Sequence, residues 1–108
     1  MANIFTSALG KNIGTSASTL VTVAALTQTT VIGLTVSNTS AGLINVDVYI
    51  TRGGVDYYIV KAADVPIGGA IVPIGGDQKV VLIASDALKV RSSVAASADA
   101  VLSVLNIT

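Results

Sequence analysis

Apolar and polar residues alternate along much of the chain with the period of two that is typical of β-strands. The clearest run is residues 44–51, in which aliphatic residues alternate with polar or amphipathic ones. Arg52-Gly53-Gly54 follows this run. Because glycine adopts positive φ without Cβ strain, we expect residues 55–61 to fold back as the second strand of a hairpin. Ile50 and Val55 would then lie close together across the turn.

Short apolar runs between turn-forming residues predict further strands. Their expected ranges are residues 20–24, 30–37, 70–72, 79–84, 88–92 and about 100–107. The alternative for the alanine-rich residues 61–65 and 94–100 is helix, but neither stretch offers three turns of helical apolar spacing, so we expect at most one short helical turn. The pattern predicts an all-β fold, a single antiparallel β-sandwich of immunoglobulin-like or jelly-roll type with about seven or eight short strands.

The 108 residues correspond to one domain. We expect residues 13–108 to form the sandwich and residues 1–12 to form an N-terminal arm, because the first ten residues are uncharged and suited to ordering on a neighbouring subunit. The start lacks the positively charged region of a signal peptide, so we expect synthesis in a cytoplasm. Polar residues interrupt the uncharged residues 12–46 every few positions, which favours strands over a membrane span.

Composition limits the partners. Apolar residues make up 52% of the chain and charged residues 11%, with six Lys or Arg against six Asp or Glu. Scattered, balanced charges are a poor match for nucleic acid or for anionic membranes, and we expect the chain to bind neither. A net charge of zero does not oppose association. We therefore expect a homo-oligomer, a dimer or a trimer.

The residue types of common catalytic and metal sites are scarce. The chain has no His, Cys, Glu or Trp, so we expect no enzyme activity, no catalytic residue, and no metal or organic cofactor. The aspartates are spaced too widely for a sequence-local carboxylate pair and are interpreted as solvated surface charges. A calcium site at Asp77 and Asp86 is the alternative, although the loop spacing of an EF-hand is absent. Gly68-Gly69 and Gly75-Gly76 are interpreted as turns, since no Lys-Ser/Thr follows them as in a phosphate-binding loop.

Interface candidates are apolar or aromatic residues expected at the surface, namely Ile4, Phe5, Leu9, Tyr49 and Tyr58. The adjacent residues Tyr57 and Tyr58 must point to opposite faces of a strand, so we expect one in the core and the other, like Tyr49, at the surface. The alternative is that these tyrosines only cover a sheet. Residues 80–84 and 101–105 are apolar on both faces, which predicts aliphatic surface that another subunit or protein buries.

Several segments resemble small virion structural proteins of tailed bacteriophages. They are Met1-Ala2-Asn3-Ile4-Phe5, residues 12–16 leading into 20–23, residues 30–34 ending in Ser37-Asn38-Thr39, residues 79–82, and Asp86-Ala87-Leu88-Lys89-Val90. The resemblance lies in Thr/Val/Ala-rich strands with short polar turns and spans nearly the whole chain.

This resemblance implies a component of the virion that binds itself and other virion proteins, such as the major capsid protein. We favour a capsid cement or decoration protein that stabilises the head through subunit contacts. A tail, collar, baseplate or fibre component is the alternative. A bacterial adhesin or carbohydrate-binding module is more remote, because four aromatic residues and no Trp offer little to stack on sugars.

Overall fold

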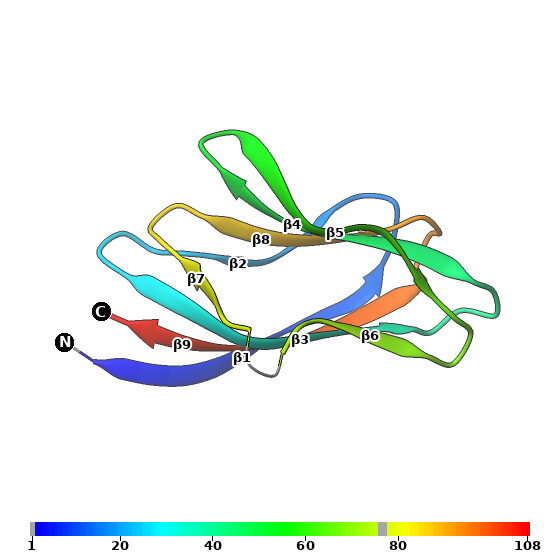
Figure 1. Ribbon diagram of the computed structural model, residues 1–108, viewed down its shortest axis with the longest axis horizontal. Coiled ribbons are helices and arrows are strands. Elements are labelled where there is room, and N and C mark those ends of the chain that lie inside the picture. The colour runs from blue at the N-terminus through cyan, green and yellow to red at the C-terminus, as the bar shows by residue number, and fades with distance from the viewer. Residues whose placement is uncertain (1, 76–77) are drawn as a thin grey trace.

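The computed structural model describes residues 2–75 and 78–108, which form nine strands in two antiparallel sheets. Sheet A has the order β1 (Asn3–Ile13), β9 (Ala98–Ile107), β3 (Gln28–Asn38) and β6 (Ala70–Ile74), and β7 (Val80–Leu82) also pairs with β3. Sheet B has the order β2 (Ser18–Thr22), β8 (Ala87–Ser92), β4 (Ile44–Arg52) and β5 (Val55–Val65). The sheets stack face to face (Figure 1), which confirms the predicted β-sandwich.

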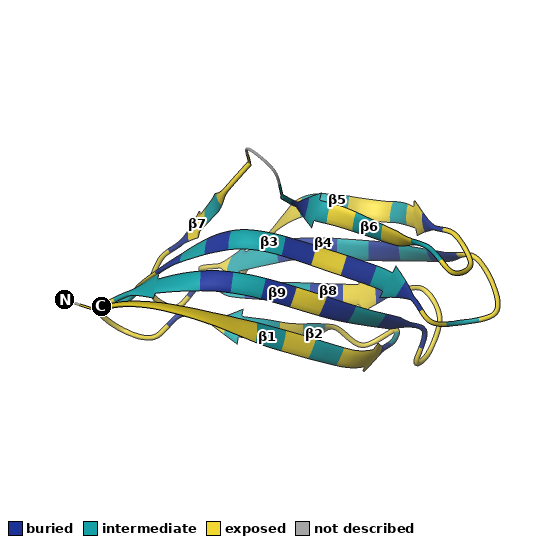
Figure 2. Ribbon diagram, turned by 90° about the horizontal axis from the view of Figure 1, so that it is seen from below, coloured by how far each residue is buried: buried dark blue, intermediate teal, exposed yellow. Residues whose placement is uncertain are grey.

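Alternation along the strands builds the core between the sheets. On β4, Ile44, Val46 and Val48 point inward and are buried, and on β9 the buried set includes Leu102 and Val104. The aliphatic core is completed by Ile13, Val23, Val31, Leu34, Val36, Val65, Ile74, Leu82, Leu88, Val90, Ala98 and Ala100. Buried residues alternate with intermediate or exposed ones along β3 and β9 (Figure 2), so these strands of sheet A have an outer face as well as an inner one.

The predicted hairpin is confirmed, but the expected proximity of Ile50 and Val55 is wrong, because they are not cross-strand partners. Arg52 pairs with Val55 and Ile50 with Tyr57, and Gly53 and Gly54 have φ of 62° and 77°. Both alanine-rich stretches are free of helix: residues 61–65 belong to β5, and β9 begins at Ala98. The expected strands all correspond to strands of the structure, with shifted ends.

The ninth strand, β1, is absent from the sequence-based prediction. Residues 3–10 pair with β9 without irregularity, from Asn3 opposite Ile107 to Gly10 opposite Ala100. The segment expected to be an arm is thus an edge strand of sheet A in this structure. The uncharged sequence that suggests an arm also suits a strand whose main chain pairs with a neighbour and whose side chains remain largely exposed.

The aspartates are not all solvated surface charges, contrary to the prediction. Asp86 is buried, at 1% exposure, and Arg52 binds both of its carboxylate oxygens. Asn38 is also buried, and its side chain bonds to the main-chain oxygens of Gly42 and Val65. These polar groups fasten turns at the ends of the sandwich, since a buried polar group is stable only when it is hydrogen-bonded.

Candidate interaction surface

The outer face of sheet A carries two rows of side chains. Each row runs across β1, β9 and β3 and then onto β6 or β7. The first row contains Val81 of β7, Thr30 of β3, Leu105 of β9 and Phe5 of β1, which are successive partners in register. In the second row, Thr35, Val101 and Leu9 are successive partners, and Val72 of β6 lies beyond Thr35. We call the apolar members of both rows the apolar face: Phe5, Leu9, Val72, Val81, Val101 and Leu105.

Five of the six members of the apolar face are exposed, and Leu105 is partly buried. Phe5 and Leu9 are each 74% exposed, and Val101 is 50% exposed although it lies on a central strand. Between the two rows lie small side chains, Ser7 opposite Ser103 and Gly33 next to it. Contiguous exposed apolar side chains on a folded domain are typical of a surface that another molecule covers.

One ion pair lies at the end of the apolar face. Lys11 Nζ is 3.0 Å from Asp99 Oδ2, and the main-chain N–H of Asn12 donates to Asp99 Oδ1 at 3.0 Å. The hydrogen bond from Asn12, supported by Lys11, lowers the pKa of Asp99. The carboxylate replaces a main-chain partner where the β1–β9 pairing becomes irregular, so the pair fixes the end of β1 and adds no net charge.

The candidates predicted on the first ten residues fall on two sides of β1. Phe5 and Leu9 belong to the apolar face. Ile4 points to the opposite side, where it lines a groove of about 270 Å³ together with Val21 and Val23. Ile4 is 54% exposed although it faces inward, so the groove is open to solvent at this side chain.

The predicted tyrosine candidates lie on sheet B, away from the apolar face. The prediction of an exposed Tyr49 is wrong: the residue is 8% exposed because Tyr58 packs on it, with ring centroids 5.0 Å apart. Lys61 Nζ lies 4.2 Å from the centre of the Tyr58 ring. Burial, followed by the nearby Asp56, raises the pKa of Tyr49.

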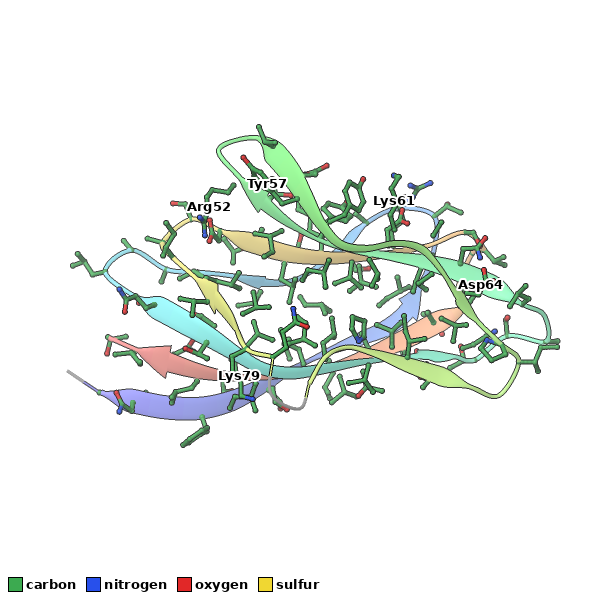
Figure 3. All side chains as sticks on the ribbon, viewed as in Figure 1. Arg52, Tyr57, Lys61, Asp64 and Lys79 are labelled. Carbon is green, nitrogen blue, oxygen red and sulfur yellow. The ribbon has the colours of Figure 1, made fainter. Side chains whose placement is uncertain are left out.

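Tyr57 does not enter the core, contrary to the expectation that one of the two adjacent tyrosines would. It pairs with Ile50 across the hairpin, but the hairpin projects beyond the rest of the sandwich (Figure 1) and leaves Tyr57 exposed. Arg52 and Tyr57 lie towards one end of this sheet, and Lys61 and Asp64 lie farther along β5 (Figure 3). The structure therefore does not bring the tyrosines together with Phe5 and Leu9.

The residue-level prediction omits most of the apolar face, namely Val72, Val81, Val101 and Leu105. A signal is present, since residues 80–84 and 101–105 are apolar on both faces of their strands. In the structure Leu102 and Val104 enter the core while Val101 points to solvent. What the sequence pattern lacks is the pairing that places β1, β9, β3, β6 and β7 in one sheet.

Within the described residues, no cluster of three or more His, Cys, Asp or Glu side chains could hold a metal ion. Of the suggested calcium ligands, Asp77 lies outside the described residues, and both carboxylate oxygens of Asp86 are engaged by Arg52. The described part of the chain also contains no helix that is long and apolar enough to cross a membrane.

Comparison with protein-family models, with curated proteins and with solved structures gives no match.

Proposed function

We propose that this chain is a structural protein of a tailed-bacteriophage virion, a cement or decoration protein that binds the capsid through the apolar face of sheet A. The observation that carries the proposal is the apolar face itself, with Phe5 and Leu9 at 74% exposure and Val101 at 50%. The resemblance of the sequence to small virion proteins supports the choice of particle. The proposal assigns the chain no catalytic role and no cofactor.

The size of the face suits a protein partner. Three strands have ten or eleven residues, and β6 and β7 share the fourth position; with about 3.3 Å of rise per residue and about 4.8 Å between strands, the outer face spans roughly 600 Å². One partner in a typical specific interface buries about 800 Å². The outer face of sheet A therefore supplies most of the surface needed to hold a neighbouring protein.

Charge also favours such a contact. The described residues of both rows carry no charge, and the Lys11–Asp99 pair at their end is neutral overall. Burying the face would therefore leave no unpaired charge buried, and burial of an unpaired charge is costly at a protein interface. Each 100 Å² of apolar surface removed from water contributes about 2.5 kcal/mol before ordering costs.

A matched pair of substitutions tests the proposal. Val101→Lys puts a charge in the middle of the apolar face, and Val55→Lys puts the same charge on sheet B at a residue of nearly equal exposure, 50% against 51%. We expect Val101→Lys to lose binding to purified particles and Val55→Lys to keep it. Equal binding by both variants would show that another surface holds the particle.

Copy number distinguishes the capsid from the tail. A capsid decoration protein should be present in hundreds of copies per particle on quantitative gels, whereas a tail, collar or baseplate part should be present in a few dozen copies or fewer. A protein that is absent from every particle would contradict the virion assignment as a whole.

A further inference from the structure

We propose that two copies of this chain pair antiparallel through the free edges of β1, across a twofold axis that passes beside Ser7. The result is a dimer in which the two A sheets become one continuous sheet. This inference goes beyond the proposed function, because the pairing requires no virus particle and concerns a different surface from the capsid-binding face.

The hydrogen-bond pattern of β1 shows which main-chain groups are available. Ala2 and Thr108 exchange both of their main-chain bonds, at 3.1 and 3.0 Å. Bonded and non-bonded pairs alternate along an antiparallel ladder, so Ile4, Thr6 and Ala8 direct their N–H and C=O groups towards β9. The N–H and C=O groups of Asn3, Phe5, Ser7 and Leu9 point away from β9. No other described strand pairs with β1.

The other described edges carry features that disfavour further pairing, and residues 3–10 of β1 carry none of them. The edge strand β5 has charged side chains at Asp56, Lys61 and Asp64 and two irregularities in its pairing with β4. β6 contains Pro73, β7 has three residues, and β2 is short and irregular at Thr19/Val21. Residues 3–10 of β1 contain no charge and no proline, and their pairing with β9 has no irregularity. A long, regular, uncharged edge is a template for another strand.

A second copy of β1 complements this edge in one register. With the axis at Ser7, Phe5 lies opposite Leu9 of the second copy, and Leu9 lies opposite its Phe5. Residues 5, 7 and 9 of one copy form bonded pairs with residues 9, 7 and 5 of the other. These three pairs exchange about six main-chain hydrogen bonds. Thr6 meets Ala8, and Lys11 meets Asn3, so no like charges oppose each other.

The same register extends the apolar face across the dimer. The row that ends in Phe5 continues into the row of the second copy that begins with Leu9, followed by its Val101. An isologous twofold contact therefore doubles the apolar face without interrupting it. This continuity favours a second copy over an unrelated strand, which would have to supply matching apolar side chains at the same spacing.

Ser7 gives a direct test, because the twofold axis places this residue opposite itself. Ser7→Lys and Ser7→Asp each set like charges face to face, and we expect each variant alone to dimerise about fivefold more weakly than the wild type. An equimolar mixture of the two variants should regain an affinity within about twofold of the wild type, since opposite charges then meet. Sedimentation velocity over a concentration series measures all four samples.

Thr35→Lys is the matched control, since Thr35 is exposed on the same outer face but two strands away from the edge. We expect it to dimerise like the wild type. If Thr35→Lys dissociates the dimer and the Ser7 variants do not, the contact is made by the face of the sheet and the proposed edge pairing is wrong.

Amide hydrogen exchange provides a second readout. In the dimer the amides of Phe5, Ser7 and Leu9 should exchange slowly, and they should become fast on dilution or in Ser7→Lys. The amides of Ile4, Thr6 and Ala8 bond to β9 and should stay protected in both states, which reports that the variant is folded. A wild-type chain that remains monomeric at the highest concentrations, with fast exchange at Phe5, Ser7 and Leu9, would overturn the proposal.

Particle binding is scored separately from dimerisation. A wild-type monomer that still binds particles through Val101 would refute the dimer and leave the proposed function intact. A wild-type dimer that is lost in Ser7→Lys, in a chain that never binds a particle, would support the dimer and refute the proposed function.

Discussion

Arg52 in the β4–β5 hairpin binds both carboxylate oxygens of Asp86 in the turn before β8, with Nε and Nη2 lying 2.8 and 2.5 Å from Oδ1 and Oδ2. The main-chain N–H of Ile83 donates to the same carboxylate at 2.9 Å. These hydrogen bonds, those from Arg52 foremost, lower the pKa of Asp86 from its ordinary value of 3.8. The pair joins two turns that are 34 residues apart in the sequence.

Asp86→Asn should destabilise the sandwich at neutral pH by about 2 kcal/mol, the usual range for losing hydrogen bonds to a charged group. Because the folded-state pKa of Asp86 is lowered, its contribution to stability is fully present above the unfolded value and is lost as the pH falls through the lower folded value. The unfolding free energies of wild type and variant should therefore converge below about pH 4. Urea unfolding from pH 7 to pH 2.5 measures this, with the exposed Asp56→Asn as control.

Local pattern is sufficient to predict most of the sheet-forming segments. The alternation at residues 44–51 and the glycines of the hairpin determine β4 and β5, because both signals act within a few residues of the chain. β1 escapes prediction because Gly10 and several small polar residues weaken its alternation. Its pairing with β9 is set by residues more than 80 positions away, which no local pattern reports.

Side-chain environments are predicted less well, for the same reason. Tyr49 does point away from the core side of β4, as the alternation requires, but Tyr58 from the neighbouring strand covers it. Asp86 resembles a surface charge in the sequence, and only the fold places Arg52 beside it. The sequence indicates the apolar face only as surplus aliphatic surface, since its outline depends on the order of the strands in sheet A.

The Gly53–Gly54 turn supports a second prediction. Both residues have positive φ, a conformation that costs a β-branched residue about 1–2 kcal/mol. Replacing both by valine should therefore lower the unfolding free energy by about 3 kcal/mol, although a Cβ atom at either position would meet nothing within 4 Å beyond the adjacent residues. Gly42→Val is the matched control, because Gly42 has equally open surroundings without positive φ. An unchanged melting temperature in the double variant would show that the turn is not essential to folding.

The hydrogen bonds of the Asn38 side chain support a third prediction. Its Nδ2 donates to the main-chain oxygens of Gly42 at 2.7 Å and Val65 at 3.0 Å, and its Oδ1 accepts from the main-chain N–H of Ser40 at 2.8 Å. Asn38→Ala leaves the buried carbonyl of Val65 without this donor, so we expect a loss of about 3 kcal/mol in thermal or urea unfolding. The exposed neighbour substitution Thr39→Ala should change stability by less than about 0.5 kcal/mol. Similar stabilities for the two variants would contradict the role of Asn38 as the link between the β3–β4 turn and the end of β5.

The last prediction decides whether β1 is part of the sandwich or a detachable arm. Deleting residues 1–10 removes the strand that pairs with β9 from Asn3 to Gly10 and leaves β9 as a new edge. Leu102 and Val104 would lose their neighbours on that side, so we expect the unfolding free energy to fall by about 3 kcal/mol and the melting temperature by about 15 °C. The double variant Phe5→Ser with Leu9→Ser is the control, because it keeps the strand and removes only exposed side chains. It should melt close to the wild type while losing particle binding. If the truncated chain instead melts like the wild type and only particle binding is lost, residues 1–10 act as an arm, and β1 contributes to assembly without stabilising the domain.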